Sequence, residues 1–150
     1  MTAYPDVTHP ALGTLRRSSF TLTDGETQYM ESYAGEIDLA GTAVELLVES
    51  SDPAVVEKLS ERLAAALAQL PRLVRRATDA IVAEFSDLDP TEADRDEAAR
   101  DLALQTLAVL PDGRLVLHLD DTTSAHFPEA RWPAVYLGGD NEVLDVTVEA

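Results

Sequence analysis

Three histidines, His9, His118 and His126, are the side chains of this sequence best suited to acid–base chemistry or metal binding. His118 and Asp120 share one face of a predicted strand, and His126 lies in the connection that follows. A metal site needs about three ligands at a suitable spacing, and this group does not supply an evident third ligand. We therefore expect ordinary hydrogen-bonded histidines, with no catalytic residue, no metal ligand and no bound cofactor.

A run of carboxylates in the middle of the chain is the second feature that could bind a ligand. We call it the acidic segment, and it consists of Asp87, Asp89, Glu92, Asp94, Asp96 and Glu97. A calcium-binding EF-hand loop starting at Asp87 would need glycine at position six and glutamate at position twelve, where the chain has Glu92 and Ala98. The acidic segment is therefore either a solvated surface or a binding site for a basic partner.

Sequence patterns typical of enzymes are missing. The chain has no cysteine, which excludes thiolate metal sites and cysteine nucleophiles. It also lacks a Walker loop, a Gly-x-Gly-x-x-Gly loop, a Gly-x-Ser-x-Gly elbow and a His-Glu-x-x-His motif. The sequence thus indicates a protein that is not an enzyme.

The net charge of the chain is −17, from 28 acidic and 11 basic residues. A small domain needs a net charge of only about 2 to 8 in magnitude for solubility. This excess repels nucleic acid and anionic membranes, and it steers a basic protein partner toward the surface. A biased composition that merely keeps the surface solvated is the alternative.

The location of the protein is expected to be cytoplasmic. No apolar run approaches the roughly 20 residues that a membrane span requires. The first residues also lack the basic start and apolar stretch of a secretion signal.

The elements that must position these side chains follow from hydrophobic periodicity. Strands are predicted over about 13–22, 28–39 and 43–48, and again over 102–110, 114–120, 133–137 and 142–148. Two amphipathic helices, or one helix bent at Pro71, are predicted over 53–86, and Thr91 caps a short helix from Glu92. The result is an α+β domain with an antiparallel sheet: a three-stranded meander, central helices on one face and two C-terminal hairpins. We assign 1–12 to an N-terminal extension and 13–150 to a single domain.

Two further groups of side chains have more than one interpretation. Arg72, Arg75 and Arg76 follow helical spacing, which favours pairing with nearby carboxylates over a partner site. Trp132 and Tyr136, at the start and within a predicted strand, either pack in the core or anchor a partner at its surface.

Several short motifs accompany this order of elements. Leu12-Gly13-Thr14 opens the first strand, and Tyr33-x-Gly35-Glu36-Ile37-Asp38 precedes Gly41 and Val44-Glu45-Leu46. The C-terminal hairpins contain Asp112-Gly113 and Asp145-Val146-Thr147-Val148. Together these motifs resemble a bacterial family known only as a domain of unknown function, number 2262. The resemblance implies an α+β fold in a bacterial cytoplasm; related small acidic domains are often suspected immunity proteins, and no catalytic residues come with the family.

Taken together, these features predict a non-catalytic acidic binding protein, most concretely an immunity-type inhibitor that sequesters a basic toxin or effector. The candidate partner-binding residues are the acidic segment together with Trp132 and Tyr136. A small-molecule-binding or enzymatic domain is the alternative, with Tyr29, Tyr33, His118, Asp120 and His126 as the residues to inspect. An acidic mimic of nucleic acid is a third interpretation.

Overall fold

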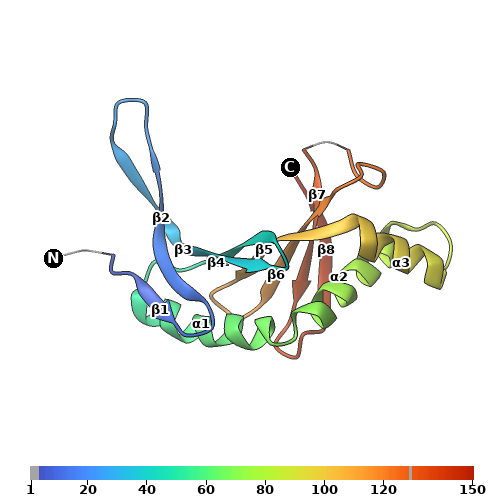
Figure 1. The fold of residues 1–150 in the computed structure, drawn as a ribbon, viewed down its shortest axis with the longest axis horizontal. Coiled ribbons are helices and arrows are strands. Elements are labelled where there is room, and N and C mark those ends of the chain that lie inside the picture. The colour runs from blue at the N-terminus through green and yellow to red at the C-terminus, as the bar shows by residue number, and fades with distance from the viewer. Residues whose placement is uncertain (1–3, 129) are drawn as a thin grey trace.

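Residues 4–128 and 130–150, which this computed structural model describes, form eight strands and three helices (Figure 1). The strands are β1 (Val7–His9), β2 (Gly13–Thr21), β3 (Thr27–Leu39), β4 (Thr42–Val48), β5 (Leu102–Val109), β6 (Leu115–Asp121), β7 (Trp132–Leu137) and β8 (Val143–Glu149). The helices are α1 (Pro53–Leu67), α2 (Leu70–Phe85) and α3 (Glu92–Asp101). The strands form one sheet with α1 and α2 against one face, which confirms the predicted α+β class.

The strands lie in the sheet in the order in which they occur in the chain. Neighbouring strands are antiparallel except β4 and β5, which pair in parallel with Glu45 opposite Thr106. The prediction of an antiparallel sheet built from a three-stranded meander and two hairpins was wrong in this respect: the sheet has eight strands and one parallel pair. The three helices connect β4 to β5, so the chain enters β5 running in the same direction as in β4. Hydrophobic alternation within a strand does not reveal a pairing partner so far away in the sequence.

Strand β1 lies within residues 1–12, which the sequence predicts to be an N-terminal extension. It pairs with β2, with Val7 opposite Leu15. Both side chains are buried in the main core, and so is that of Leu12. This short strand therefore forms one edge of the sheet.

The helical layer begins where the sequence places its cap. The Asp52 carboxylate accepts a hydrogen bond from the Ala54 N–H at 3.0 Å, and Pro53 occupies the first turn of α1. The layer contains two helices rather than one bent helix, because α1 ends at Leu67 and Pro71 lies in the first turn of α2. Within the part of the chain that the structure describes, no helix is long and apolar enough to cross a membrane.

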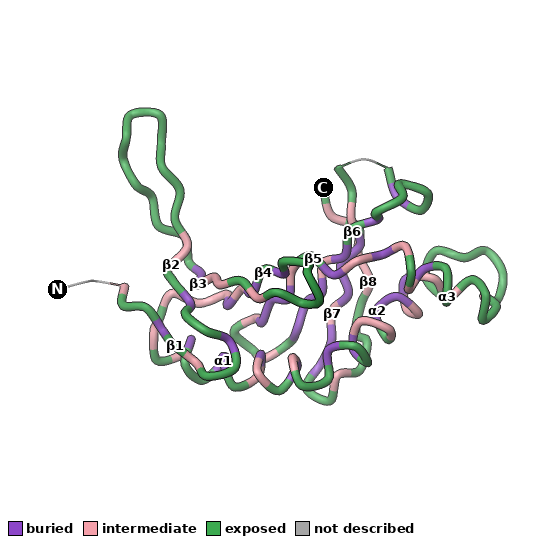
Figure 2. Tube along the Cα trace, viewed as in Figure 1, coloured by how far each residue is buried: buried purple, intermediate pink, exposed green. Residues whose placement is uncertain are grey.

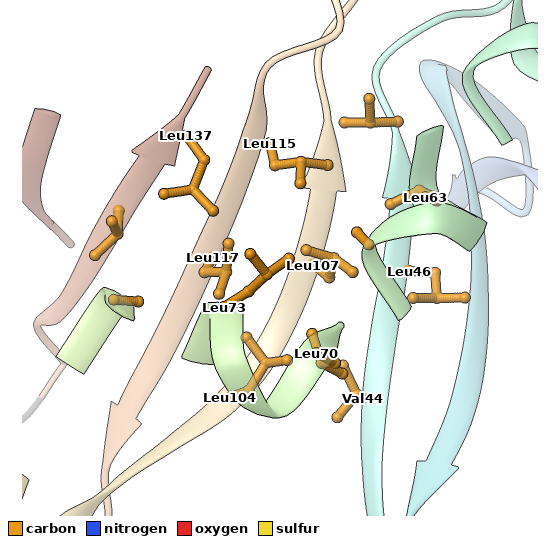
Figure 3. Close-up of a cluster of buried hydrophobic side chains, with 14 of the residues drawn as sticks. Val44, Leu46, Leu63, Leu70, Leu73, Leu104, Leu107, Leu115, Leu117 and Leu137 are labelled. Atoms are coloured by element: carbon orange, nitrogen blue, oxygen red, sulfur yellow. The ribbon is translucent and has the colours of Figure 1, made fainter. Parts of the chain in front are cut away.

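The main core lies between these two helices and the sheet (Figure 3). Leu63 of α1 and Leu73 of α2 are fully buried there against leucines of the central strands, such as Leu46, Leu107 and Leu117. Buried positions follow the central strands and the inner faces of the helices, whereas the outer part of the β2–β3 hairpin is exposed (Figure 2). The helices thus cover one face of the sheet and leave the other uncovered (Figure 1).

Candidate functional site

The uncovered face of the sheet, formed by strands β3–β8, is the first candidate surface, and we call it the open face. Side chains alternate along each strand, so that Val44, Leu46 and Val48 of β4 point into the main core while Glu45 and Leu47 point to the open face. The same alternation applies to β6 and β7 and, apart from an irregularity between Leu104 and Thr106, to β5. The open face therefore consists of every second residue of strands that are otherwise buried.

The centre of the open face is apolar. The strand register aligns Leu47, Ala108, Val116 and Tyr136 in one row across β4, β5, β6 and β7. Ala108 and Val116 are buried, and Leu47 and Tyr136 are partly buried against them in a second, smaller hydrophobic cluster that also contains Ala134. This row gives the open face an apolar floor of modest size.

Carboxylates surround that floor. They lie on β3, β4, β6 and β8, and one of them directly follows the end of β4. These carboxylates are Glu36, Asp38, Glu45, Glu49, Asp120, Asp145 and Glu149. Strands β3–β8 contain no lysine and no arginine. The nearest arginine in the register, Arg16 of β2, lies 3.5 Å from Asp6 and is thus already paired. The open face is consequently acidic at its rim and apolar at its centre.

Glu36 and Glu45 occupy directly opposite positions in the β3–β4 pair, and both are exposed. Like charges at such cross-strand positions destabilise a sheet. Nothing in the packing of the core requires either side chain to be charged. The pair therefore represents a local cost to the fold that a cation on this surface would relieve.

Trp132 and His118 form the polar contact at one end of the open face. The indole Nε1–H donates a hydrogen bond of 2.9 Å to Nδ1 of His118. An indole can only donate, so His118 must accept through an unprotonated Nδ1. Burial lowers the pKa of His118, and the carboxylates of Glu149, Glu45 and Glu49 oppose this effect. His118 is therefore held in its neutral form.

Tyr136 lies two strand positions beyond Ala134 on the same face as Trp132. Its hydroxyl is 3.4 Å from Oε1 of Glu149, which also accepts a hydrogen bond of 3.0 Å from the Thr147 hydroxyl. Burial raises the pKa of Tyr136, and the nearby charge of Glu149 adds to the shift. Of the two sequence interpretations of Trp132 and Tyr136, the structure favours neither alone, because both rings pack partly against the sheet and remain partly exposed.

The acidic segment lies elsewhere, in the α2–α3 loop and in α3. Half of its carboxylates are engaged within the molecule. Arg75 pairs with Asp96 at 3.0 Å, with Asp79 at 2.9 Å and with Glu92 at 3.2 Å. The hydrogen bonds to Asp96 and then Asp79 raise the pKa of Arg75. The side chain of Asp94 accepts from the Thr91 N–H at 2.9 Å and completes a capping box. These contacts confirm the intramolecular interpretation for Arg75.

The remaining carboxylates of the acidic segment, Asp87, Asp89 and Glu97, line a groove together with Asp94. The groove has a volume of about 600 Å³ and lies between the end of α2, α3 and the connection after β6. Its apolar wall includes the largely exposed Leu88 and the rings of Phe85 and Phe127. These two rings meet edge to face with their centroids 5.4 Å apart. The structure thus separates the predicted partner-binding residues into two groups, one around this groove and one on the open face.

The residues named for the small-molecule alternative are not brought together. Tyr33 is fully buried and its hydroxyl donates to the carbonyl of Pro5, whereas Tyr29 is exposed on the β2–β3 hairpin. His118 contacts Trp132, and Nε2 of His126 lies 3.1 Å from a carboxylate oxygen of Asp101. Of these side chains, His126 lines the groove beside the acidic segment, and none lines the apolar pocket formed around Leu70 and Val74.

Sequence reasoning missed the opposed pair Glu36 and Glu45, although the sequence held the necessary signal. The turn at Ala40 and Gly41 lies midway between them, and both turn residues have positive φ angles of 53° and 89°. A two-residue turn at that point fixes the register of the hairpin, and with it the position of Glu36 opposite Glu45.

Comparisons of the chain with family models, with curated proteins and with solved structures found no match.

Proposed function

We propose that this protein is a non-catalytic binding protein that takes a basic protein partner on its open face, in the manner of an immunity-type inhibitor of a basic toxin or effector. The observation that carries the proposal is the composition of that face: a partly exposed apolar and aromatic centre inside a rim of carboxylates, on strands without lysine or arginine. Protein interfaces commonly combine aromatic anchors at the centre with a polar rim.

Electrostatics favour a basic partner over a neutral one. The opposed Glu36 and Glu45 repel each other in the free protein, and a lysine or arginine placed between them would turn this repulsion into attraction. The same carboxylates would accelerate encounter with a basic surface, so the association rate should fall steeply as salt is added.

The size of the open face adds a second requirement. Six strands spaced about 4.8 Å apart and about 20 Å long present roughly 500 Å². A typical stable interface buries about 800 Å² on each partner. The β2–β3 hairpin and the β6–β7 connection rise on the same side of the sheet, away from α1 and α2 (Figure 1). We infer that a partner also contacts the hairpin, where Phe20, Tyr29 and Met30 are 51%, 53% and 48% exposed.

The test uses a matched pair of charge variants. Basic proteins captured from cell extract on the wild-type protein are identified, purified and titrated by calorimetry against Glu36→Gln/Glu45→Gln and against Glu57→Gln/Glu84→Gln. The second variant removes the same charge from exposed positions of α1 and α2. We expect the open-face variant to lose at least tenfold in affinity and the helix variant to change little. Equal losses in both would mean that net charge alone attracts the partner, and unchanged binding in both would refute the proposed surface.

Trp132 supplies a second readout, because it is the one tryptophan in the sequence. Labelled with 5-fluorotryptophan, the protein gives a single ¹⁹F signal that reports from the open face. A bound partner should shift this signal. A partner that binds tightly without shifting it occupies another surface, and the groove beside the acidic segment is then the site to test.

A further inference from the structure

The C-terminal end of α3 and the connection after β6 are joined by backbone contacts. The carbonyl oxygen of Asp101 accepts hydrogen bonds from the Thr122 N–H at 3.0 Å and from the Thr122 hydroxyl at 2.8 Å. These contacts fix the last residue of the helix against the start of the connection. Side chains at the end of α3 therefore have defined neighbours in that connection.

Three potential metal ligands meet at this junction. Glu97 and Asp101 are four residues apart in α3 and so share one face of the helix. His126 approaches them from the connection, with its Nε2 at 3.1 Å from Oδ2 of Asp101. One ligand atom from each of the three residues lies within 4.8 Å of the others. Ligand atoms of a four-coordinate zinc ion are about 3.3 Å apart, so the three groups must draw closer to bind the ion, and the exposed Glu97 side chain has room to move.

The position of His126 is fixed by a buried carboxylate. Oδ2 of Asp121 accepts the N–H groups of His126 at 2.6 Å and of Phe127 at 2.9 Å, while Oδ1 accepts the N–H and hydroxyl of Thr123 at 3.2 and 2.9 Å. Asp121 is 8% exposed. With the backbone of His126 held in this way, only its side-chain torsions remain to be fixed when a metal binds, which favours affinity.

The groove beside this junction is an independent observation that points to a ligand. Glu97 and His126 belong to its wall, and its volume is about 600 Å³. A metal ion held by three side chains here would lie beside the groove, where water or a donor group of a ligand could complete its coordination. The carboxylates of the acidic segment along the groove add a local negative potential that favours a cation.

We propose that Glu97, Asp101 and His126 form a binding site for a divalent first-row transition ion such as Zn²⁺. The donor set selects this class, since imidazole suits Zn²⁺ and its neighbours in the series, whereas Ca²⁺ and Mg²⁺ prefer oxygen ligands alone. Arg100, whose Nε is 3.9 Å from Oδ1 of Asp101, leaves the Oδ2 that faces His126 available. The site does not depend on the proposed function, because it uses none of the side chains of the open face.

His9 provides the matched control for His126. Its Nε2 lies 3.1 Å from the carboxylate of Glu61, the same distance as in the His126–Asp101 contact. However, its Nδ1 accepts a hydrogen bond from the Ala11 N–H at 3.0 Å, which leaves the proton on Nε2 in the neutral ring. His9 therefore donates to Glu61 and offers no free lone pair on Nε2, and no third ligand is grouped with it among the described residues.

The experiment is a calorimetric titration of the untagged full chain with Zn²⁺ alone, repeated with Mg²⁺ and Ca²⁺. The proteins are the wild type, Glu97→Gln, His126→Gln and His9→Gln, each checked for folding by circular dichroism. We expect one Zn²⁺ per chain, at least tenfold weaker binding in Glu97→Gln and His126→Gln, and wild-type binding in His9→Gln. Absence of Zn²⁺ binding, equal affinity in all four proteins, or equal binding of Ca²⁺ would each overturn the proposal.

A spectroscopic measurement on the wild type keeps the proposal falsifiable if His126→Gln does not fold. The imidazole signals of the three histidines are followed by NMR during the Zn²⁺ titration. We expect the His126 signals to change at the first equivalent while those of His9 do not. Parallel changes at both histidines would identify Zn²⁺ as a surface counterion and refute the site.

Discussion

Replacing Asp121 by asparagine tests how far one buried carboxylate organises the connection between β6 and β7. The two oxygens of Asp121 accept four hydrogen bonds, from the N–H and hydroxyl of Thr123 and from the N–H groups of His126 and Phe127. Asparagine has nearly the same shape but only one oxygen, and its NH₂ group cannot accept. Asp121→Asn therefore removes the acceptor from two of the four donors.

The magnitude follows from the environment of those donors. A hydrogen bond to a charged group contributes about 1.5–3 kcal/mol, and two such bonds are lost. Phe127 is buried, but Thr123 and His126 are exposed and their N–H groups can turn to water. We therefore expect the free energy of unfolding at pH 7 to fall by about 2–4 kcal/mol, somewhat below the full sum of the two bonds. Urea denaturation followed by circular dichroism measures this difference.

Asp120→Asn is the matched control, since its carboxylate is exposed on the open face one residue away. Its effect should stay within about 0.5 kcal/mol. A loss of less than about 0.5 kcal/mol for Asp121→Asn, or equal losses for the two variants, would refute the role assigned to Asp121.

The same variant has a defined pH dependence. Burial opposes ionisation of Asp121 and is the largest single influence, but the hydrogen bonds from His126, Phe127 and Thr123 together hold its pKa below the ordinary value. A lowered pKa in the folded state gives a stabilisation that is complete above the ordinary pKa and is lost as the pH falls through the folded-state pKa. The difference between wild type and Asp121→Asn should thus be constant above about pH 5 and shrink below about pH 4. A difference that grows on acidification would contradict this assignment.

Three further predictions concern the core, the acidic segment and the open face. Leu63→Ala should lower the free energy of unfolding by about 2–5 kcal/mol, because Leu63 is fully buried, and Leu67→Ala should lower it by about half as much, because Leu67 is partly buried. Urea denaturation that ranks the two variants in the opposite order would contradict this packing. Neutralising all six carboxylates of the acidic segment should lower the melting temperature, because it removes the charge from two partners of Arg75 and from the Asp94 side chain that completes the capping box of α3. Simple relief of self-repulsion would raise the melting temperature instead. Finally, an NMR titration should place the pKa of His118 below the ordinary histidine value. Trp132→Phe should raise this pKa, because it removes the donor to Nδ1 and exposes the imidazole ring. An unchanged pKa in the variant would show that the contact does not favour the neutral form.

Much of the secondary structure could be predicted from local patterns. The change from alternating to helical periodicity at Pro53 marks the start of α1, and Thr91 marks the start of α3. The turn residues at Ala40 and Gly41 also fix the β3–β4 register. These features depend on neighbouring residues, so the sequence alone carries the information.

The contacts that build the candidate sites are of another kind. The sequence groups His126 with His118 and Asp120, because they are close along the chain. In the structure His126 instead meets Asp101, since the N–H and hydroxyl of Thr122 in the β6–β7 connection both donate to the Asp101 carbonyl at the end of α3. Likewise, the sequence favours pairing of Arg75 with nearby carboxylates but does not show that two of its partners, Glu92 and Asp96, belong to the acidic segment. Such contacts depend on how helices and strands dock, which periodicity does not specify.

The single parallel pair in the sheet has a consequence for how the chain folds. Strands β1–β4 pair with neighbours in sequence, and so do β5–β8, which means that each half can form through short loops. Only the β4–β5 contact must wait until the three helices have brought the chain back. Before that step both strands expose unpaired backbone edges rich in leucine and valine, and such edges readily pair with other chains. Slow pairing of β4 with β5 would therefore lead to aggregation at these strand edges. Substitutions that weaken α1 or α2 should increase aggregation during refolding more strongly than substitutions in the β2–β3 hairpin.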